Sequence, residues 1–120
     1  MGKMKTFNVT GVTFRNNPTD TMRRIDMISK YCGHGSKFEL QREPENSHSN
    51  YAIAVRQVFK SGGSILLGYV PDNKKNPLAK ELALLMDDGW KPAVEFGRKF
   101  IDEDTGECKG LQLRYENQNG

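Results

Sequence analysis

The sequence predicts a mainly β domain with two helices, an α+β fold arranged as a small six-stranded barrel. Six short stretches rich in β-branched and aromatic residues are separated by Gly, Pro and Asn, which is typical of strands joined by turns. Two further stretches repeat apolar residues at helical spacing. The length of 120 residues suits one domain that buries its own core.

The strand predictions follow from the alternation of polar and apolar residues. The predicted strands cover residues 6–14, 36–42, 51–59, 64–70, 90–101 and 110–115. In the first strand, Gly11 interrupts the alternation and indicates a bulge or a close backbone approach. The side chains expected to face the core there are Phe7, Val9, Val12 and Phe14.

Each predicted helix follows an Asn-Pro pair. The first helix is expected to begin at Pro18, with Asn17 as its N-cap and Asp20 near its positive end. One of the glycines that follow residue 32 is expected to end it. The second helix is expected over roughly residues 77–88 and is followed by another glycine.

Composition and charge narrow the class of protein. The chain has 18 Lys and Arg against 15 Asp and Glu, and this net charge of +3 permits nucleic-acid binding without requiring it. No apolar run reaches the ~20 residues that cross a bilayer, and the amino terminus lacks the apolar segment of a secretory signal. We therefore expect a cytoplasmic protein that contacts no membrane. We expect one domain over residues 1–115 and a flexible tail over residues 116–120.

The sequence favours a binding protein over an enzyme. His34 and His48 are its only histidines, too few for a zinc centre with three histidine ligands. Cys32 and Cys108 have no neighbouring cysteine at zinc-ligand spacing and are expected to be free thiols. The chain also lacks the GxxxxGK[ST] phosphate loop. We therefore expect no catalytic activity, no metal and no cofactor.

The order of several short motifs is distinctive. Val-Thr-Gly-Val at 9–12 is followed by Leu-Gln-Arg-Glu-Pro at 40–44 and by Asn46. Ala-Ile-Ala-Val at 52–55 and Leu-Gly-Tyr-Val-Pro at 67–71 then precede a leucine-rich helix. In this order, the sequence closely resembles the HIRAN domain family over most of its length. Such modules occur alone in bacteria and phages, and at the amino terminus of eukaryotic fork-remodelling ATPases such as the helicase-like transcription factor.

The resemblance implies an OB-like or SH3-like barrel that binds DNA. In the eukaryotic module the site captures the free 3′ end of a single strand, and basic and aromatic side chains grip phosphates and stack bases. Carried over by position, the DNA-binding residues would be Thr13, Phe14, Arg15, Asn46, His48, Ser49, Tyr51, Tyr69, Lys74 and Lys75.

Several alternatives stay open at this point. Phe14 and Tyr51 are either inward core residues or faces for bases, and Asn46 could simply shape its own loop. The family pattern has a basic residue at Thr13 and an acid at Ser49, so general single-strand binding and 3′-end recognition both remain possible. We predict a nucleic-acid-binding module of DNA repair or replication, with DNA-processing proteins as further candidate partners. The alternative is a protein-interaction module that binds a peptide along an edge strand.

Overall fold

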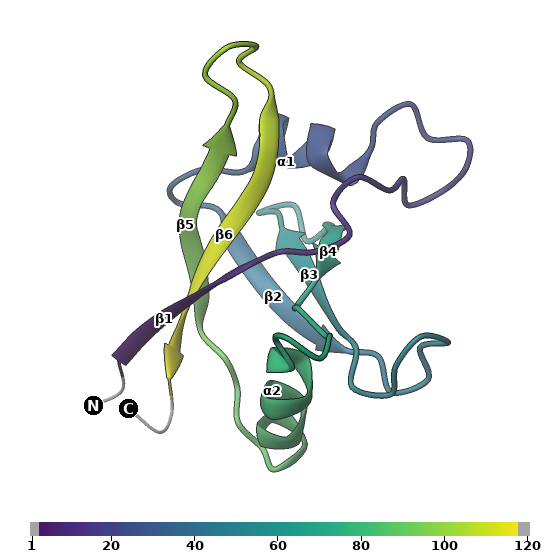
Figure 1. Ribbon diagram of the computed structural model, residues 1–120, viewed down its shortest axis with the longest axis vertical. Coiled ribbons are helices and arrows are strands. Elements are labelled where there is room, and N and C mark those ends of the chain that lie inside the picture. Colours follow the sequence, from purple (N-terminus) through teal and green to yellow (C-terminus); the bar gives the residue numbers. More distant parts are fainter. Residues whose placement is uncertain (1–2, 118–120) are drawn as a thin grey trace.

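The computed structural model describes residues 3–117, which form two three-stranded antiparallel sheets and two helices (Figure 1). The first sheet has the order β1-β6-β5 and the second the order β2-β3-β4. The mainly β fold with six strands and two helices is therefore confirmed. The elements are β1 (Lys3–Asn8), α1 (Arg24–Tyr31), β2 (Lys37–Arg42), β3 (Ile53–Val58), β4 (Ser64–Tyr69), α2 (Leu78–Asp87), β5 (Val94–Ile101) and β6 (Cys108–Asn117).

The strands of residues 3–117 do not close into a barrel, which corrects the predicted architecture. The two sheets meet instead at one isolated bridge, where Thr10 and Tyr69 exchange two backbone hydrogen bonds of 2.9 Å each. One residue earlier, the Val9 amide donates to the Leu111 carbonyl of β6 at 2.9 Å. The chain then turns away at Gly11, whose φ is 72°, so it cannot continue as a strand beside β4.

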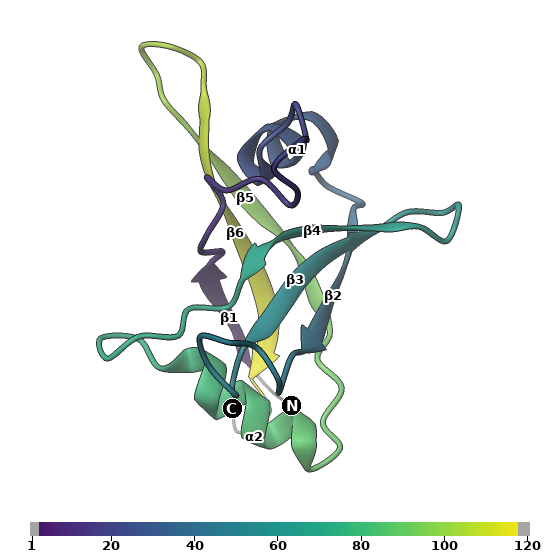
Figure 2. The ribbon, with the colours of Figure 1, turned by 90° about the vertical axis from the view of Figure 1, so that its right-hand side faces the viewer.

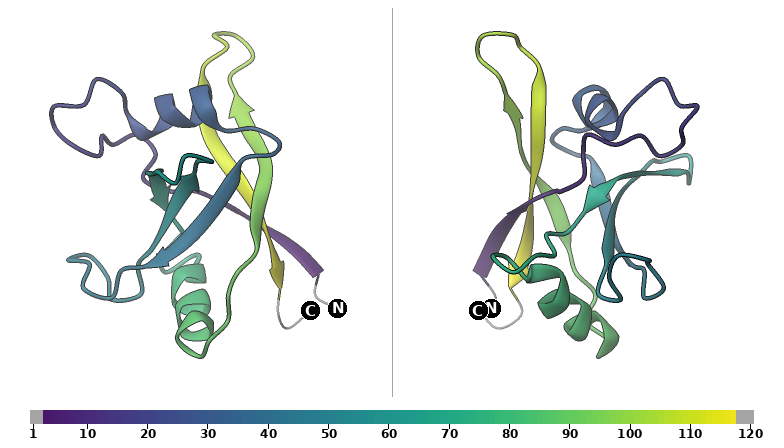
Figure 3. Two further views of the ribbon diagram at one scale, coloured as in Figure 1. Left: turned by 180° about the vertical axis from the view of Figure 1, so that it is seen from behind. Right: turned by 45° about the vertical axis from the view of Figure 1, so that its right-hand side comes forward.

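The core lies between the two sheets. Ile53, Val55 and Leu67 from one sheet and Leu111 and Leu113 from the other are all fully buried. α1 packs its apolar face on this core near one end of the molecule, and α2 lies at the opposite end (Figures 1 and 3). The β5–β6 hairpin extends past α1 (Figure 3).

The first predicted strand, residues 6–14, is too long, because β1 ends at Asn8. Phe7, Val9 and Val12 are buried as predicted. Phe14 is not, since 64% of it is exposed. The turn at Gly11 explains this difference, because it takes the chain out of the alternating pattern and onto the surface.

α1 begins well after the predicted start at Pro18. Asn17 and Asp20 form a turn instead, in which the Asp20 amide donates to the Asn17 carbonyl at 3.0 Å and the Asn17 amide donates to the Asp20 carboxylate at 3.1 Å. The helix is capped by Asp26, whose carboxylate accepts the Arg23 amide at 2.7 Å. α2 lies where it was predicted, within a residue at each end.

The carboxyl-terminal strand is longer than predicted, because β6 continues through Asn117. Residues 118–120 of the predicted tail lie outside the described residues. Within the described part of the chain, neither helix is long and apolar enough to cross a membrane.

Candidate functional site

A cavity of about 590 Å³ lies where three segments meet. These segments are the loop before α1, the loop between β2 and β3, and the chain at the end of β4 and just beyond it. The two loops project from the same side of the molecule, at the right in Figure 1, and Figure 2 looks onto that side. We call this cavity the groove. Its lining is Thr10, Gly11, Phe14, Arg15, Arg24, Asn46, His48, Ser49, Ala52, Tyr69, Val70, Asp72 and Asn73.

The groove brings together six of the ten predicted site residues: Phe14, Arg15, Asn46, His48, Ser49 and Tyr69. They come from segments that are far apart in the sequence. The groove therefore combines exposed aromatic, guanidinium and imidazole groups with the polar side chains of one loop.

Tyr69 is held at its hydroxyl and at its ring. Its hydroxyl donates to the Glu43 carboxylate at 2.9 Å, and the Asn46 amide group donates to the same oxygen at 2.9 Å. The Arg24 guanidinium lies 5.7 Å from the centroid of the Tyr69 ring, a cation–π contact. Burial and the hydrogen bond to Glu43 raise the pKa of the Tyr69 hydroxyl, and the charges of Arg24 and Arg56 oppose that rise. The phenol is therefore a fixed, protonated group beside the groove.

The loop between β2 and β3 is shaped by its own side chains. The side-chain oxygen of Asn46 accepts the His48 amide at 2.8 Å, and the Ser49 hydroxyl accepts the Tyr51 amide at 3.1 Å. Such contacts between a side chain and a nearby backbone amide fix a turn without neighbouring strands. The interpretation that Asn46 shapes its loop is therefore confirmed, while His48 stays exposed at the groove.

Arg42 fastens the same loop to α2. Its guanidinium donates to the carbonyls of Asn50 at 3.0 Å and Ala52 at 3.3 Å. It also forms a two-pronged ion pair with Asp87, with its shorter contact at 3.1 Å. The side chain of Arg42 is only 17% exposed, whereas that of Asp87 is 53% exposed, so the pair is shielded from water on the Arg42 side alone.

Arg24 fixes the loop before α1. Its Nη1 donates to the Gly11 carbonyl at 2.9 Å and its Nε to the Asn16 side-chain oxygen at 2.7 Å. The Asn16 amide group in turn donates to the Leu66 carbonyl of β4 at 3.0 Å. These contacts hold residues 14–15 at the groove. The sequence carries no signal of this role of Arg24, because its partners lie outside the helix.

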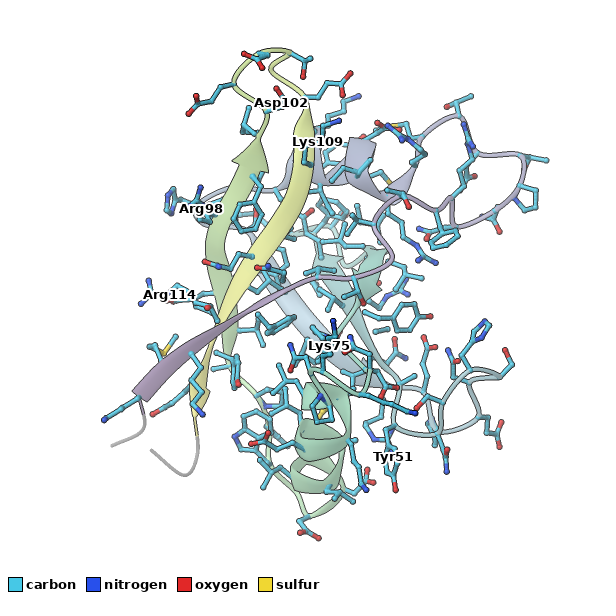
Figure 4. The ribbon with its side chains drawn as sticks, in the orientation of Figure 1. Tyr51, Lys75, Arg98, Asp102, Lys109 and Arg114 are labelled. Atoms are coloured by element: carbon cyan, nitrogen blue, oxygen red, sulfur yellow. The ribbon has the colours of Figure 1, made fainter. Side chains whose placement is uncertain are left out.

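Thr13 and Tyr51 do not line the groove. Thr13 is exposed beside α1, in a second hollow that also includes Arg23 and Lys109. Tyr51 is half-buried against the core, and the Lys80 ammonium lies 5.5 Å from the centroid of its ring. Figure 4 shows Tyr51 at the base of its loop. Its environment matches the interpretation of Tyr51 as a core residue.

Lys74 and Lys75 also lie outside the groove lining. Both are exposed in a turn that begins at Asn73, whose side-chain oxygen accepts the Lys75 amide at 3.0 Å (Figure 4). Asp72 and Asn73, directly before them, do line the groove. The two lysines therefore follow the groove lining directly in the sequence without being part of it.

The fold and this site define a class of protein: a small β module with a groove that offers aromatic and cationic groups between two anchored loops. The family model for the HIRAN domain matches residues 4–104, so the chain belongs to the HIRAN family. This confirms the resemblance found in the sequence. No curated protein sequence gave a significant match.

Two solved structures have a similar fold. A Lactobacillus plantarum protein from the Northeast Structural Genomics Consortium is 20% identical, with a TM-score of 0.56 over 98% of this chain and 100% of its own. The HIRAN domain of human HLTF is 19% identical, with a TM-score of 0.52 over 97% of this chain and 78% of its own. At these identities the two structures establish a shared fold.

Proposed function

We propose that the protein is a non-catalytic module that binds single-stranded DNA, or a 3′ DNA end, in the groove. The observation that carries this proposal is the Phe14 ring, 64% exposed, beside Arg15 in a groove that also presents Tyr69 and His48. Single strands need aromatic faces for their bases and cations for their phosphates. Membership of the HIRAN family supports the same function, since the family is associated with DNA binding.

The charges of the groove suit a strand end. Arg15 and Arg24 are the cations of its lining, and Asp72 is its acid. A guanidinium binds phosphate oxygens through charge-assisted hydrogen bonds. A carboxylate accepts a hydrogen bond from a hydroxyl but repels a phosphate. We therefore expect an end with a free 3′ hydroxyl to bind better than one that carries a 3′ phosphate.

The test is fluorescence anisotropy with three labelled oligonucleotides: a single strand with a free 3′ hydroxyl, the same strand with a 3′ phosphate, and a blunt duplex. Each is titrated at about 50 and about 200 mM salt, because log K for a single strand falls by ~0.7 per neutralised phosphate for each tenfold rise in salt. Preference for the free 3′ hydroxyl supports end recognition. Equal, salt-sensitive binding of both single strands supports general strand binding.

Phe14 offers the sharpest variant, because it is exposed and its removal leaves the core intact. A stacked base is worth ~1–3 kcal/mol, so Phe14→Ala should weaken binding roughly 5- to 150-fold. Ile101→Ala is the matched control, since Ile101 is also an apolar residue with 51% exposure and lies outside the groove lining. If both variants bound like the parent, the groove would not be the binding site.

The alternative is a peptide bound along an edge strand. Such binding uses backbone hydrogen bonds and apolar pockets, so its affinity need not fall steeply with salt. Failure of all three oligonucleotides to bind, even at the lower salt, would favour this alternative.

A further inference from the structure

The sheet β2-β3-β4 has an outer face that begins at the groove. Tyr69 pairs with Ala54 across β3 and β4, and Arg56 lies two residues further along β3. Residues two apart on a strand point to the same face, so Arg56 shares the face of Ala54 and Tyr69. Its cross-strand neighbours there are Leu66 on β4 and Glu39 on β2.

No helix of the described residues covers this outer face, although Ala54 on it is fully buried. Figure 2 shows the sheet from this side, and neither of the two helices in the described residues crosses it. Glu39 is exposed, and Arg56 and Leu66 are half-buried. Lys37, at the start of β2, is exposed on the same face, because its partner Val58 lies two residues beyond Arg56.

Only one nitrogen of the Arg56 guanidinium has a hydrogen-bond partner among the described residues. Its Nε donates to the Ser64 hydroxyl on β4 at 3.0 Å. Among residues 3–117 its terminal amino groups have no hydrogen-bond partner, and it forms no ion pair with Glu39. Its charge nevertheless acts on Tyr69, where it opposes the rise in pKa that burial and Glu43 cause, so the two groups are electrostatic neighbours. An Arg held by one nitrogen, with no partner for its two others among the described residues, is well suited to bind an anion.

We propose that a bound DNA strand continues from the groove across the outer face of β2-β3-β4, and that Arg56 binds a backbone phosphate outside the groove. This inference rests on the proposed function, because it extends the path of the same strand. Two features select single-stranded DNA as the occupant. The face is continuous with the groove at Tyr69, and it carries the cations Arg56 and Lys37, while the carboxylate of Glu43 at Tyr69 is already hydrogen-bonded to Tyr69 and Asn46. An open sheet face next to a cationic path is a surface that single strands can follow.

Oligonucleotide length tests the inference, since only a longer strand can reach Arg56. Parent and Arg56→Ala proteins are titrated with single strands of about four and about ten nucleotides, within the range of strand lengths that small β modules bind. We expect Arg56→Ala to bind the longer strand on the order of tenfold more weakly and the shorter strand unchanged, since a charge-assisted hydrogen bond carries a loss of that size. The salt slope for the longer strand should fall by ~0.7.

Arg98→Ala is the matched control. It also removes one Arg, here an exposed one on β5 of the other sheet, on the side of the molecule away from Tyr51 in Figure 4. We expect no change in affinity for either strand. Thermal unfolding of all variants shows whether a loss of affinity is a loss of folding.

The outcomes separate the inference from the proposed function. Equal losses on both strands, or no loss on the longer strand, would overturn the role of Arg56 while binding in the groove stands. If the parent bound neither strand, the proposed function and this inference would both fail.

As a second variant, Glu39→Gln removes the one acid opposite Arg56, and should strengthen binding of the longer strand alone. Weaker binding of the longer strand by this variant would contradict the path.

Discussion

Gly68→Ala tests how closely the two sheets meet beside the groove. Gly68 lies on β4, directly before Tyr69, and its φ is 152°. An added Cβ would lie 2.6 Å from Val9 Cγ1 and would also collide with the Thr10 carbonyl. Real Cβ atoms essentially never approach so closely, so β4 or residues 9–10 must move apart.

The cost has two parts. A backbone conformation that only glycine adopts readily costs ~1–3 kcal/mol for another residue. Forcing an extra methyl into a packed position costs a further ~1–3 kcal/mol. We therefore expect the free energy of unfolding to fall by ~2–6 kcal/mol, a large share of the ~5–15 kcal/mol that stabilises a typical domain. The same displacement should pull Tyr69 away from Thr10 and distort the groove.

Urea unfolding followed by the fluorescence of Trp90, the single tryptophan, measures this loss. Gly35→Ala is the matched control, because Gly35 also has a positive φ, 89°, but nothing lies within 4 Å of its added Cβ. The control should lose only the conformational part, ~1 kcal/mol. If Gly68→Ala lost no more stability than Gly35→Ala, the close approach of the sheets would be refuted.

Three further predictions concern single side chains. Cys32 is 5% exposed, and burial raises the pKa of its thiol to about 12. In native protein, maleimide should therefore modify Cys108 far faster than Cys32. Equal rates of modification by mass spectrometry would contradict this. The pKa of the Tyr69 hydroxyl is raised in the folded state, so the protonated hydroxyl stabilises the fold fully below about pH 10, and this stabilisation is lost as the pH rises above that value. Unfolding curves should therefore show a smaller loss of stability at alkaline pH for Tyr69→Phe than for the parent. Arg24→Met removes the contacts that hold the loop before α1, and should weaken single-strand binding about tenfold in anisotropy titrations while the protein remains folded. Parent-like affinity of Arg24→Met would show that the loop needs no such anchor.

Local pattern was sufficient to predict most of the elements. The alternation of residues identified six strands, and the expected core positions Phe7, Val9 and Val12 are buried. The helical spacing around Leu82 identified α2. These features depend on neighbours within a few residues, which a sequence displays directly.

Features set by distant contacts could not be predicted. The Asn17-Pro18 pair is a helix-start signal, but here Asn17 closes a turn with Asp20 and the helix starts later. The closed barrel was expected from the strand count and the family resemblance. Whether β1 joins β4 along its length depends on the turn at Gly11, which sequence alone could not evaluate.

The candidate site was predictable to the extent that motifs carried it. The motif series led to Phe14, His48 and Tyr69, which do line one groove. It did not lead to Arg24 or Arg56. Their positions depend on partners in other elements, and a lone arginine in a helix or strand carries no signal of such partners.

The two backbone amides in the bridge between Thr10 and Tyr69 can report whether the groove is occupied. Each amide hydrogen is held by the other residue's carbonyl, so both can exchange with solvent only when the junction of the two sheets opens. A molecule that rests on Tyr69 and closes the groove would disfavour that opening. Slower deuterium uptake at these two amides would then register occupancy of the groove in unlabelled protein, whatever the chemistry of the occupant.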